Sequence, residues 1–213
     1  MTARSFPHRS TCSIPFGPVS SDAEETALRT CTSWRPPTPS SIGSKWNSSK
    51  PAHQFVRLRV SNRFASSVHI YSDDEYANMR LFITDDGRYG IALNDDEIVS
   101  AFSHRDSKYP SAAKSMLAVA VQQGGRRLDC FDTALPRIYS EAGFVPVARL
   151  KWNDDYAPDG WNCRVYSRYN GGRPDVVFMA HDPAALDSRY VPGSGLYVNS
   201  YDEGIDASRA QVR

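Results

Sequence analysis

Apolar residues gather in three short runs near the middle of the chain, at residues 80–84, 89–93 and 96–104. Each run contains β-branched or aromatic residues, and polar turn residues separate it from the next. We expect these runs to form a meander of three strands. Before the meander, Ser72 can cap one helical turn that ends near residue 78.

After the meander the apolar period changes from two residues to about 3.6, which is typical of helices. Tyr109-Pro110 is expected to open the first helix, because Pro suits the first helical turn and keeps the residue before it extended. Gly124 and Gly125 are expected to end it. Its predicted buried stripe consists of Ala113, Met116, Leu117 and Ala120.

A second strand and helix follow. Residues 127–131 form a short, partly apolar run, and Asp132 or Thr133 can cap the helix after it. Pro136 falls in the first turn, where a missing N–H costs little. Gly143 supplies a left-handed cap at the end of this helix. Its apolar face, which is expected to pack on a sheet, consists of Leu135, Ile138, Tyr139 and Ala142.

Residues 144–152 and 174–180 are two further runs with the pattern of strands. The segment between them is rich in Gly and Pro and is too polar for a buried element. We therefore predict a hairpin with a long inserted loop. Long ordered loops in compact domains are often functional.

The two ends of the chain differ from its centre. Residues 1–52 are rich in Ser, Thr, Pro and Arg and are predicted to be a disordered or poorly structured extension. Residues 53–183 are predicted to form the folded domain, with further candidate strands at 55–60 and 68–71. Residues 184–213 are rich in Gly, Ser and Asp and are predicted to be an irregular tail.

Composition limits the classes of function. The chain has 213 residues with 40% hydrophobic content, as in a globular domain, and its formal net charge of +1 gives no support to nucleic acid as a partner. It contains no apolar run of about 20 residues, so no membrane span is expected. The four cysteines have no metal-site spacing and are expected to be free thiols in the cytoplasm, either of the cell or of a host cell.

One sequence match suggests a family. Tyr139-Ser-Glu-Ala-Gly143-Phe144 fits a Tyr-x-x-x-Gly-Phe pattern, and before it the chain reads strand, basic loop, helix, strand. In this order and motif the chain resembles the GNAT superfamily of acyl-CoA-dependent N-acetyltransferases. Several of its short sequence segments also resemble acetyltransferase-like domains encoded by bacteriophages. The resemblance spans about residues 80–180. It implies an α/β (α+β) fold with a mixed, mostly antiparallel central sheet flanked by helices.

The resemblance also implies acetyl-CoA as the acyl donor. In the family a glycine-rich loop at a helix N-terminus binds the CoA diphosphate, for which helix N-termini are suited. Here residues 108–113 occupy that place, and Ser stands where a Gly is expected, so a polar turn is the alternative interpretation. The implied donor-binding residues are Phe102, Ser103, Arg105, Lys108, Ser111, Ala112, Ala113, Lys114 and Asp132.

The implied reaction is acetyl transfer to an amine acceptor that the sequence does not identify. Tyr139 would protonate the leaving thiolate, and a main-chain N–H near residues 101–103 would polarise the thioester carbonyl. Glu97 is the candidate base, with a solvated strand end or water-mediated deprotonation as alternatives. A different class of function also stays open, namely a non-catalytic protein of the same fold with a phage structural or protein-interaction role.

Overall fold

The computed structural model describes residues 42–43, 64–84, 86–104, 107–109 and 113–212. In this part of the chain, one eight-stranded mixed sheet has the order β1-β2-β3-β4-β5-β7-β6-β8. All neighbouring strands are antiparallel except β4–β5 and β6–β8, which are parallel. The expected mixed sheet, mostly antiparallel and flanked by helices, is therefore confirmed.

The strands and helices lie largely where the hydrophobic pattern predicts them. The strands are β1 (Ile42–Gly43), β2 (Arg80–Thr84), β3 (Tyr89–Asn94), β4 (Glu97–Ser103), β5 (Arg127–Phe131), β6 (Ala142–Leu150), β7 (Val176–Leu186) and β8 (Leu196–Val198). The helices are α2 (Asp73–Ala77), α3 (Ala113–Gln122), α4 (Leu135–Glu141) and α5 (Tyr201–Gln211). Short 3-10 turns cover Ala65–Ser67, Asp154–Tyr156 and Asn170–Gly172.

The meander and its preceding helix are confirmed. Strands β2, β3 and β4 pair in sequence as antiparallel neighbours. Helix α2 begins after Ser72, whose side chain accepts from the backbone N–H of Glu75, while the Glu75 carboxylate accepts from the Ser72 N–H. This reciprocal capping box satisfies two backbone donors and explains why so short a helix forms there.

The transition from α4 to β6 is also as predicted. Gly143 has φ of +90°, a conformation that costs little only for glycine, and it turns the chain directly from helix into strand. Tyr139 and Ala142 are buried, and Leu135 and Ile138 pack beside them. Pro136 stands in the first turn. Of the two expected capping residues, Thr133 accepts from the Leu135 N–H at 3.4 Å through its Oγ1, whereas Asp132 does not have the expected capping role.

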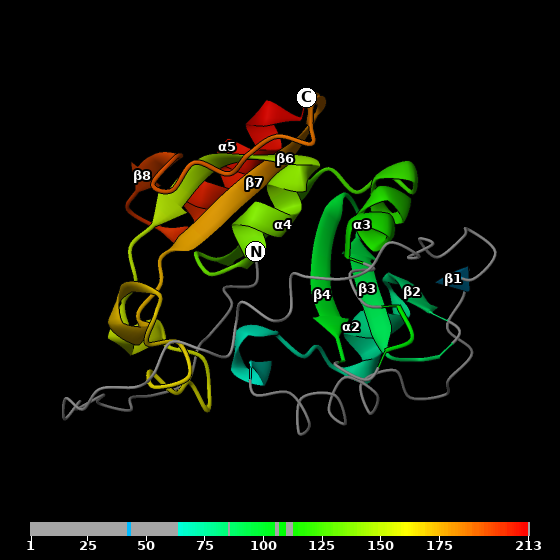
Figure 1. The fold of residues 1–213 in the computed structure, drawn as a ribbon, viewed down its shortest axis with the longest axis horizontal. Helices are drawn as coiled ribbons and strands as arrows, with labels where there is room; N and C mark the ends of the chain where they lie inside the picture. Colours follow the sequence, from blue (N-terminus) through cyan, green and yellow to red (C-terminus); the bar gives the residue numbers. More distant parts are fainter. Residues whose placement is uncertain (1–41, 44–63, 85, 105–106, 110–112, 213) are drawn as a thin grey trace.

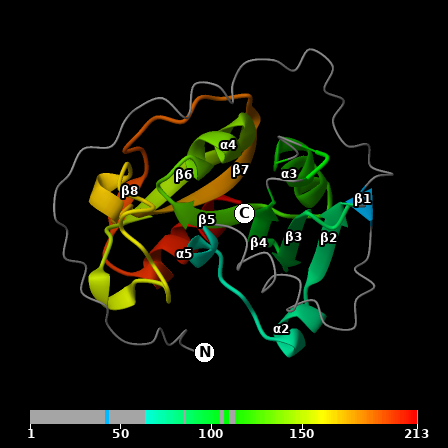
Figure 2. The same cartoon turned by 60° about the horizontal axis from the view of Figure 1, so that its bottom comes forward.

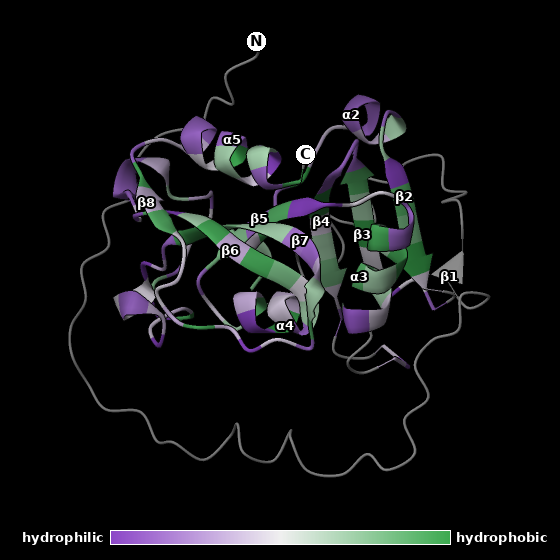
Figure 3. Cartoon of the chain, turned by 90° about the horizontal axis from the view of Figure 1, so that it is seen from above, coloured by the Kyte–Doolittle hydropathy of each residue, from purple (hydrophilic) through white to green (hydrophobic). Residues whose placement is uncertain are grey.

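The sheet separates two layers of helices. Figure 3 shows α3 and α4 on one face and α2 and α5 on the other. The larger core, beneath α3 and α4, includes Leu93, Met116, Leu128 and Met179. A smaller core beneath α2 is built from Tyr71, Tyr76, Ala92, Val99 and Phe102.

The sheet divides into two halves that meet at β4 and β5. Figure 1 shows β2–β4 with α2 and α3 on one side and β6–β8 with α4 and α5 on the other. The parallel ladder between β4 and β5 has a single registered pair, Glu97 with Arg127, at the start of both strands. Beyond this pair the two strands part.

The C-terminal segment is not irregular, so that expectation is wrong. β7 continues to Leu186, β8 pairs with β6, and Tyr201–Gln211 forms α5. The signal that could have found α5 is its capping, because Ser200 accepts from the Glu203 N–H at 3.2 Å. Because the segment has a central glycine and a low hydropathy, its hydrophobic periodicity does not indicate a helix.

Three other segment predictions remain. No strand forms at 68–71, which follows a 3-10 turn and has no regular secondary structure. The predicted strand at 55–60 and the predicted extension at 1–52 lie outside the described residues, apart from 42–43.

Helix α5 packs on the sheet at a glycine. A Cβ at Gly204 would lie 2.3 Å from the ring of Phe178, which is fully buried on β7. We expect Gly204→Val to lower the free energy of unfolding by about 2 kcal/mol, because overpacking a closed site costs about 1–3 kcal/mol. Chemical denaturation measures this. Ala210→Val, at an exposed position of α5, is the control and should cost about 0.5 kcal/mol. Equal losses in both variants would contradict the packing.

Candidate functional site

The parting of β4 and β5 creates a cleft of about 1870 Å³. Its floor consists of residues 97–101 of β4 and 128–131 of β5, with Leu135 and Tyr139 of α4 beside them. The walls come from residues 66–71, the β6–β7 connection, β8 and α5. Segments far apart in the sequence therefore meet around one hollow that both halves of the sheet share.

Strand β4 carries a bulge where it lines the cleft. Val99 pairs with Ala92 and Phe102 with Gly90, so Ser100 and Ala101 together oppose one residue of β3. The extra residue resets the alternation, which explains why Val99 and Phe102, three positions apart, lie in the same small core. Ser100 and Ala101 have no ladder partner on β5 either.

The bulge is held in a strained conformation. Ser100 has φ of +52°, which is uncommon for a residue with a side chain. Its hydroxyl lies 3.1 Å from the Tyr76 hydroxyl and donates to the carbonyl of His69 at 3.1 Å. Strain of this kind persists only where its surroundings fix it, and it is often found at functional sites.

An ion cluster closes the end of the cleft where β4 and β5 pair. The Nε of Arg127 donates to Asp96 Oδ1 at 2.9 Å, and its Nη1 lies 3.2 Å from Glu97 Oε2. Glu97 and Arg127 are only 6% and 5% exposed. The Oε1 atom of Glu97 has no hydrogen-bond partner among the described residues. Glu97 is thus a buried ion-pair member lining the cleft, which excludes the alternative of a solvated strand end.

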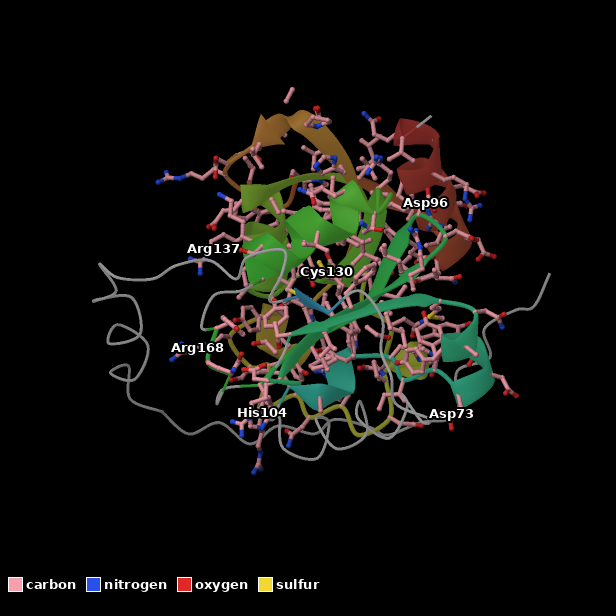
Figure 4. All side chains as sticks on the ribbon, turned by 90° about the vertical axis from the view of Figure 1, so that its right-hand side faces the viewer. Asp73, Asp96, His104, Cys130, Arg137 and Arg168 are labelled. Carbon is pink, nitrogen blue, oxygen red and sulfur yellow. The ribbon has the colours of Figure 1, made fainter. Side chains whose placement is uncertain are left out.

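Tyr139 and Cys130 line the cleft on the side of α4. Burial, with smaller contributions from Cys130, Tyr89 and Asp129, holds the pKa of Tyr139 well above its ordinary value. Burial likewise raises the pKa of the free Cys130 thiol. Both groups therefore keep their protons at neutral pH, so Tyr139 can donate and Cys130 is not a thiolate nucleophile. Figure 4 shows Cys130 in the interior, while Asp96 and His104 flank the two ends of β4.

The β6–β7 connection is the long inserted loop of the predicted hairpin, and side-chain contacts hold it in place. Trp161 stacks on Tyr166 at 3.8 Å between ring centroids, and it also contacts Phe131 at the end of β5. The Tyr166 hydroxyl donates to the Phe64 carbonyl at 3.0 Å. Figure 2 shows this connection, in yellow, at the end of the molecule away from β1 and β2. It forms a fixed wall of the cleft.

The predicted donor-binding residues near α3 are only partly described. Arg105, Ser111 and Ala112 lie outside the described residues. Ala113 begins α3 and packs against the larger core. The Lys114 ammonium forms an exposed ion pair with Asp187 beyond β7.

Lys108 and the residue before it are tied to the β2–β3 turn. The Asp86 carboxylate accepts from the Lys108 N–H at 2.8 Å and from the Ser107 hydroxyl at 3.1 Å. It also accepts from the Arg88 N–H at 3.0 Å. Asp86 therefore positions the chain that leads toward α3, a role that its place in a turn did not reveal.

Three further predicted residues lie differently from the expectation. The Phe102 side chain lies in the small core beneath α2, and Phe102 does not line the cleft. Ser103, at the exposed end of β4, pairs with Tyr89. Asp132 does not line the cleft but binds the guanidinium of Arg149.

Arg149 organises a buried polar cluster that sequence reasoning missed. It is 3% exposed, and besides Asp132 it contacts Asp175 at 3.6 Å and the Tyr190 hydroxyl at 3.0 Å. Burial alone would lower the pKa of Arg149, but its bonds to Asp132 and Tyr190 raise it above the ordinary value. Burial raises the pKa of Tyr190 to about 12. The cluster joins β5, β6 and the segment before β8 into one body.

Other observations complete the description of the site. In the described residues, no group of three or more His, Cys, Asp or Glu is arranged to hold a metal. No helix in the part of the chain that the structure covers is long and apolar enough to cross a membrane. Cys163 is disulfide-bonded, so the expectation of free thiols is wrong for this residue.

Comparison with known proteins adds no assignment. No protein-family model matches the chain, and comparisons with curated proteins and with solved structures also gave no match.

The contacts of Asp86 predict how its carboxyl group and the neighbouring Lys108 amide respond to pH. Burial alone would raise the pKa of Asp86, but bonds from Thr84, Lys108, Arg88 and Ser107 lower it below its ordinary value. The stabilising effect is therefore present above the unfolded pKa of about 3.9 and is lost as the pH falls through the lower folded value. An NMR titration should show the Lys108 amide shift following the Asp86 carboxyl. An unchanged Lys108 titration in Asp86→Asn would contradict this assignment.

Proposed function

We propose that this chain is an acyl-CoA-dependent N-acyltransferase of the GNAT type, which moves an acetyl group from acetyl-CoA to an amine. The observation that carries the proposal is the parting of β4 and β5 after one pair. Two parallel strands that separate in this way expose backbone groups along a shared cleft, where an extended chain of amides can bind as an added strand. The pantetheine arm of CoA is such a chain.

The order of elements supports the same proposal. A meander leads into β4, then α3, β5, α4 and the β6–β7 hairpin, which is the order that the resemblance implies. The Tyr-x-x-x-Gly-Phe match lies at the end of α4, and its Tyr139 lines the cleft while Gly143 makes the turn. A core tyrosine far from the cleft would have argued against a role in the chemistry.

The proposed chemistry uses groups that the cleft brings together. A neutral amine attacks the thioester carbonyl carbon, and the carbonyl oxygen becomes an oxyanion. The bulge at Ser100 and Ala101 leaves main-chain groups without ladder partners, so an N–H there can bind this oxygen. As the C–S bond breaks, Tyr139 donates its proton to the leaving thiolate. The proton released by the amine nitrogen passes to Glu97, directly or through water.

The acceptor side of this site is built by unexpected elements. The β6–β7 connection forms one wall and α5 forms another. Before the meander the described residues form one short α-helix, α2 (Asp73–Ala77), and we infer that the C-terminal helix α5 supplies the second wall of the acceptor side. The amine therefore enters between α5 and residues 66–71.

One observation favours the alternative of a non-catalytic protein with the same fold. Lys114, an expected partner of the diphosphate, is already paired with Asp187. This pair is solvent-exposed and worth little, so an anionic ligand can displace it. Donor binding thus decides between the two functions.

The first test is binding of acetyl-CoA to the full chain, measured by calorimetry together with hydrogen exchange. We expect binding, and slower exchange at residues 100–102 and 129–130, because the pantetheine amides would pair with their backbone. Ser111→Glu should weaken binding by repelling the diphosphate, whereas Ala118→Glu, exposed on α3, is the control for the added charge. A folded protein that binds no acetyl-CoA would instead favour the non-catalytic function.

The second test removes one hydroxyl from the cleft. Tyr139→Phe should lower kcat about 100-fold, as loss of a general acid does, and leave the affinity for acetyl-CoA nearly unchanged. Release of the CoA thiol with a panel of primary amines measures kcat. Tyr89→Phe is the matched control, since Tyr89 is equally buried in the same core but does not line the cleft. Unchanged turnover in Tyr139→Phe would exclude Tyr139 from the mechanism.

A further inference from the structure

The charge of the cleft wall differs in sign from that of the whole chain. The chain carries a formal net charge of +1. In contrast, the described residues that line the cleft include seven carboxylates but only three lysines and arginines. The excess of negative charge at the cleft wall creates a local field that attracts cations and repels anions.

The carboxylates come from three separate parts of the fold. Glu97 and Asp129 lie on the floor, in β4 and β5. The wall made by the β6–β7 connection adds Asp154, Asp155 and Asp159, and α5 adds Asp202 and Asp206. The three cationic residues are Lys151, Arg173 and Arg209, of which Arg173 pairs with Asp154 and Arg209 with Asp206.

A second observation points to a ligand at the floor. Glu97 is 6% exposed and lines the cleft, and in the described part of the chain neither its Oε1 nor the Nη1 of Arg127, 3.2 Å from its Oε2, has a hydrogen-bond partner. A buried carboxylate oxygen without a donor is costly unless something else supplies one. Nor does Arg127 neutralise the site, since its one positive charge faces both Asp96 and Glu97. An ammonium group offers the missing donor and the missing charge.

We propose that the acceptor is an amine that carries at least two positive charges. This inference rests on the proposed function, because it assigns the acceptor of that same cleft. One ammonium group binds Glu97 at the floor, gives up one proton to water and becomes the nucleophile. The second proton, released from the nitrogen during attack on the thioester, then passes to Glu97. A second cationic group stays near the carboxylates of α5 and the β6–β7 connection and holds the molecule in place.

A matched pair of small amines tests the charge requirement. The probes are 1,5-diaminopentane and 5-amino-1-pentanol, which have the same reach but differ in the charge of the far end. Calorimetry gives the affinity of each for the full chain, with and without acetyl-CoA, and CoA thiol release gives turnover. We expect the diamine to bind about tenfold more tightly than the amino alcohol, with the difference shrinking at high salt.

Charge-removing variants locate the site. Asp202→Asn with Asp206→Asn, on the wall made by α5, should weaken diamine binding about tenfold and leave the amino alcohol unchanged. Asp73→Asn with Asp74→Asn removes the same charge from another helix, α2, whose aspartates are exposed and do not line the cleft. This control should bind the diamine as the unchanged chain does.

The outcomes separate this inference from the proposed function. Equal use of both amines by a chain that binds acetyl-CoA would overturn the charge requirement and leave the acyltransferase proposal standing. Diamine binding that depends on Asp202 and Asp206, in a chain that binds no acetyl-CoA, would overturn the role of the cation as acceptor. Loss of diamine binding in the α2 control as well would overturn the assignment to the cleft.

Discussion

The structure depends on one junction, the single pair between Glu97 and Arg127 that joins the two halves of the sheet. The guanidinium of Arg127 contacts Asp96 and Glu97, and the Asp96 carbonyl accepts from the backbone N–H groups of Arg126 and Arg127. The start of β5 is thereby fixed against the start of β4. Beyond this pair, strands β4 and β5 separate, and the cleft is the space between them.

A sheet that separates in its middle loses ladder hydrogen bonds that a continuous sheet would have. The cost is limited because each half has its own partners, with β5 fully paired to β7 and β4 paired to β3 on its other side. The core beneath α3 and α4 also runs across the junction, from Leu93 and Met116 to Leu128 and Met179. The strained bulge at Ser100 is the remaining cost, and Tyr76 and His69 hold it. A feature supported from outside its own strand is the kind that selection for a site would keep.

The sequence predicted those elements whose local signals agree with their tertiary setting. The meander, α3, β5, α4 and the Gly143 turn all combine periodicity with a cap or a breaker, and these elements are confirmed, except that the predicted start of α3 at Pro110 lies outside the described residues. Helix α5 was missed because its central Gly204, which weakens any local prediction, is needed for contact with Phe178. The role of Asp132 was predicted incorrectly for a related reason. A carboxylate before a helix resembles a cap, and only the fold brings Arg149 to it.

The candidate site was predictable in part, since Tyr139 and Glu97 were named from the sequence and both line the cleft. Its charge was not predictable, because the carboxylates come from β4, β5, α5 and the β6–β7 connection, and an average over the chain hides them. Lys108 and Lys114, in contrast, flank the start of α3 and do not line this cleft. An anionic donor and a cationic acceptor require opposite fields, and one shared cleft can serve both only if these fields are kept apart. The proposed donor and acceptor ends differ in this way, which is why the sign of charge at the wall made by α5 bears on which molecule enters there.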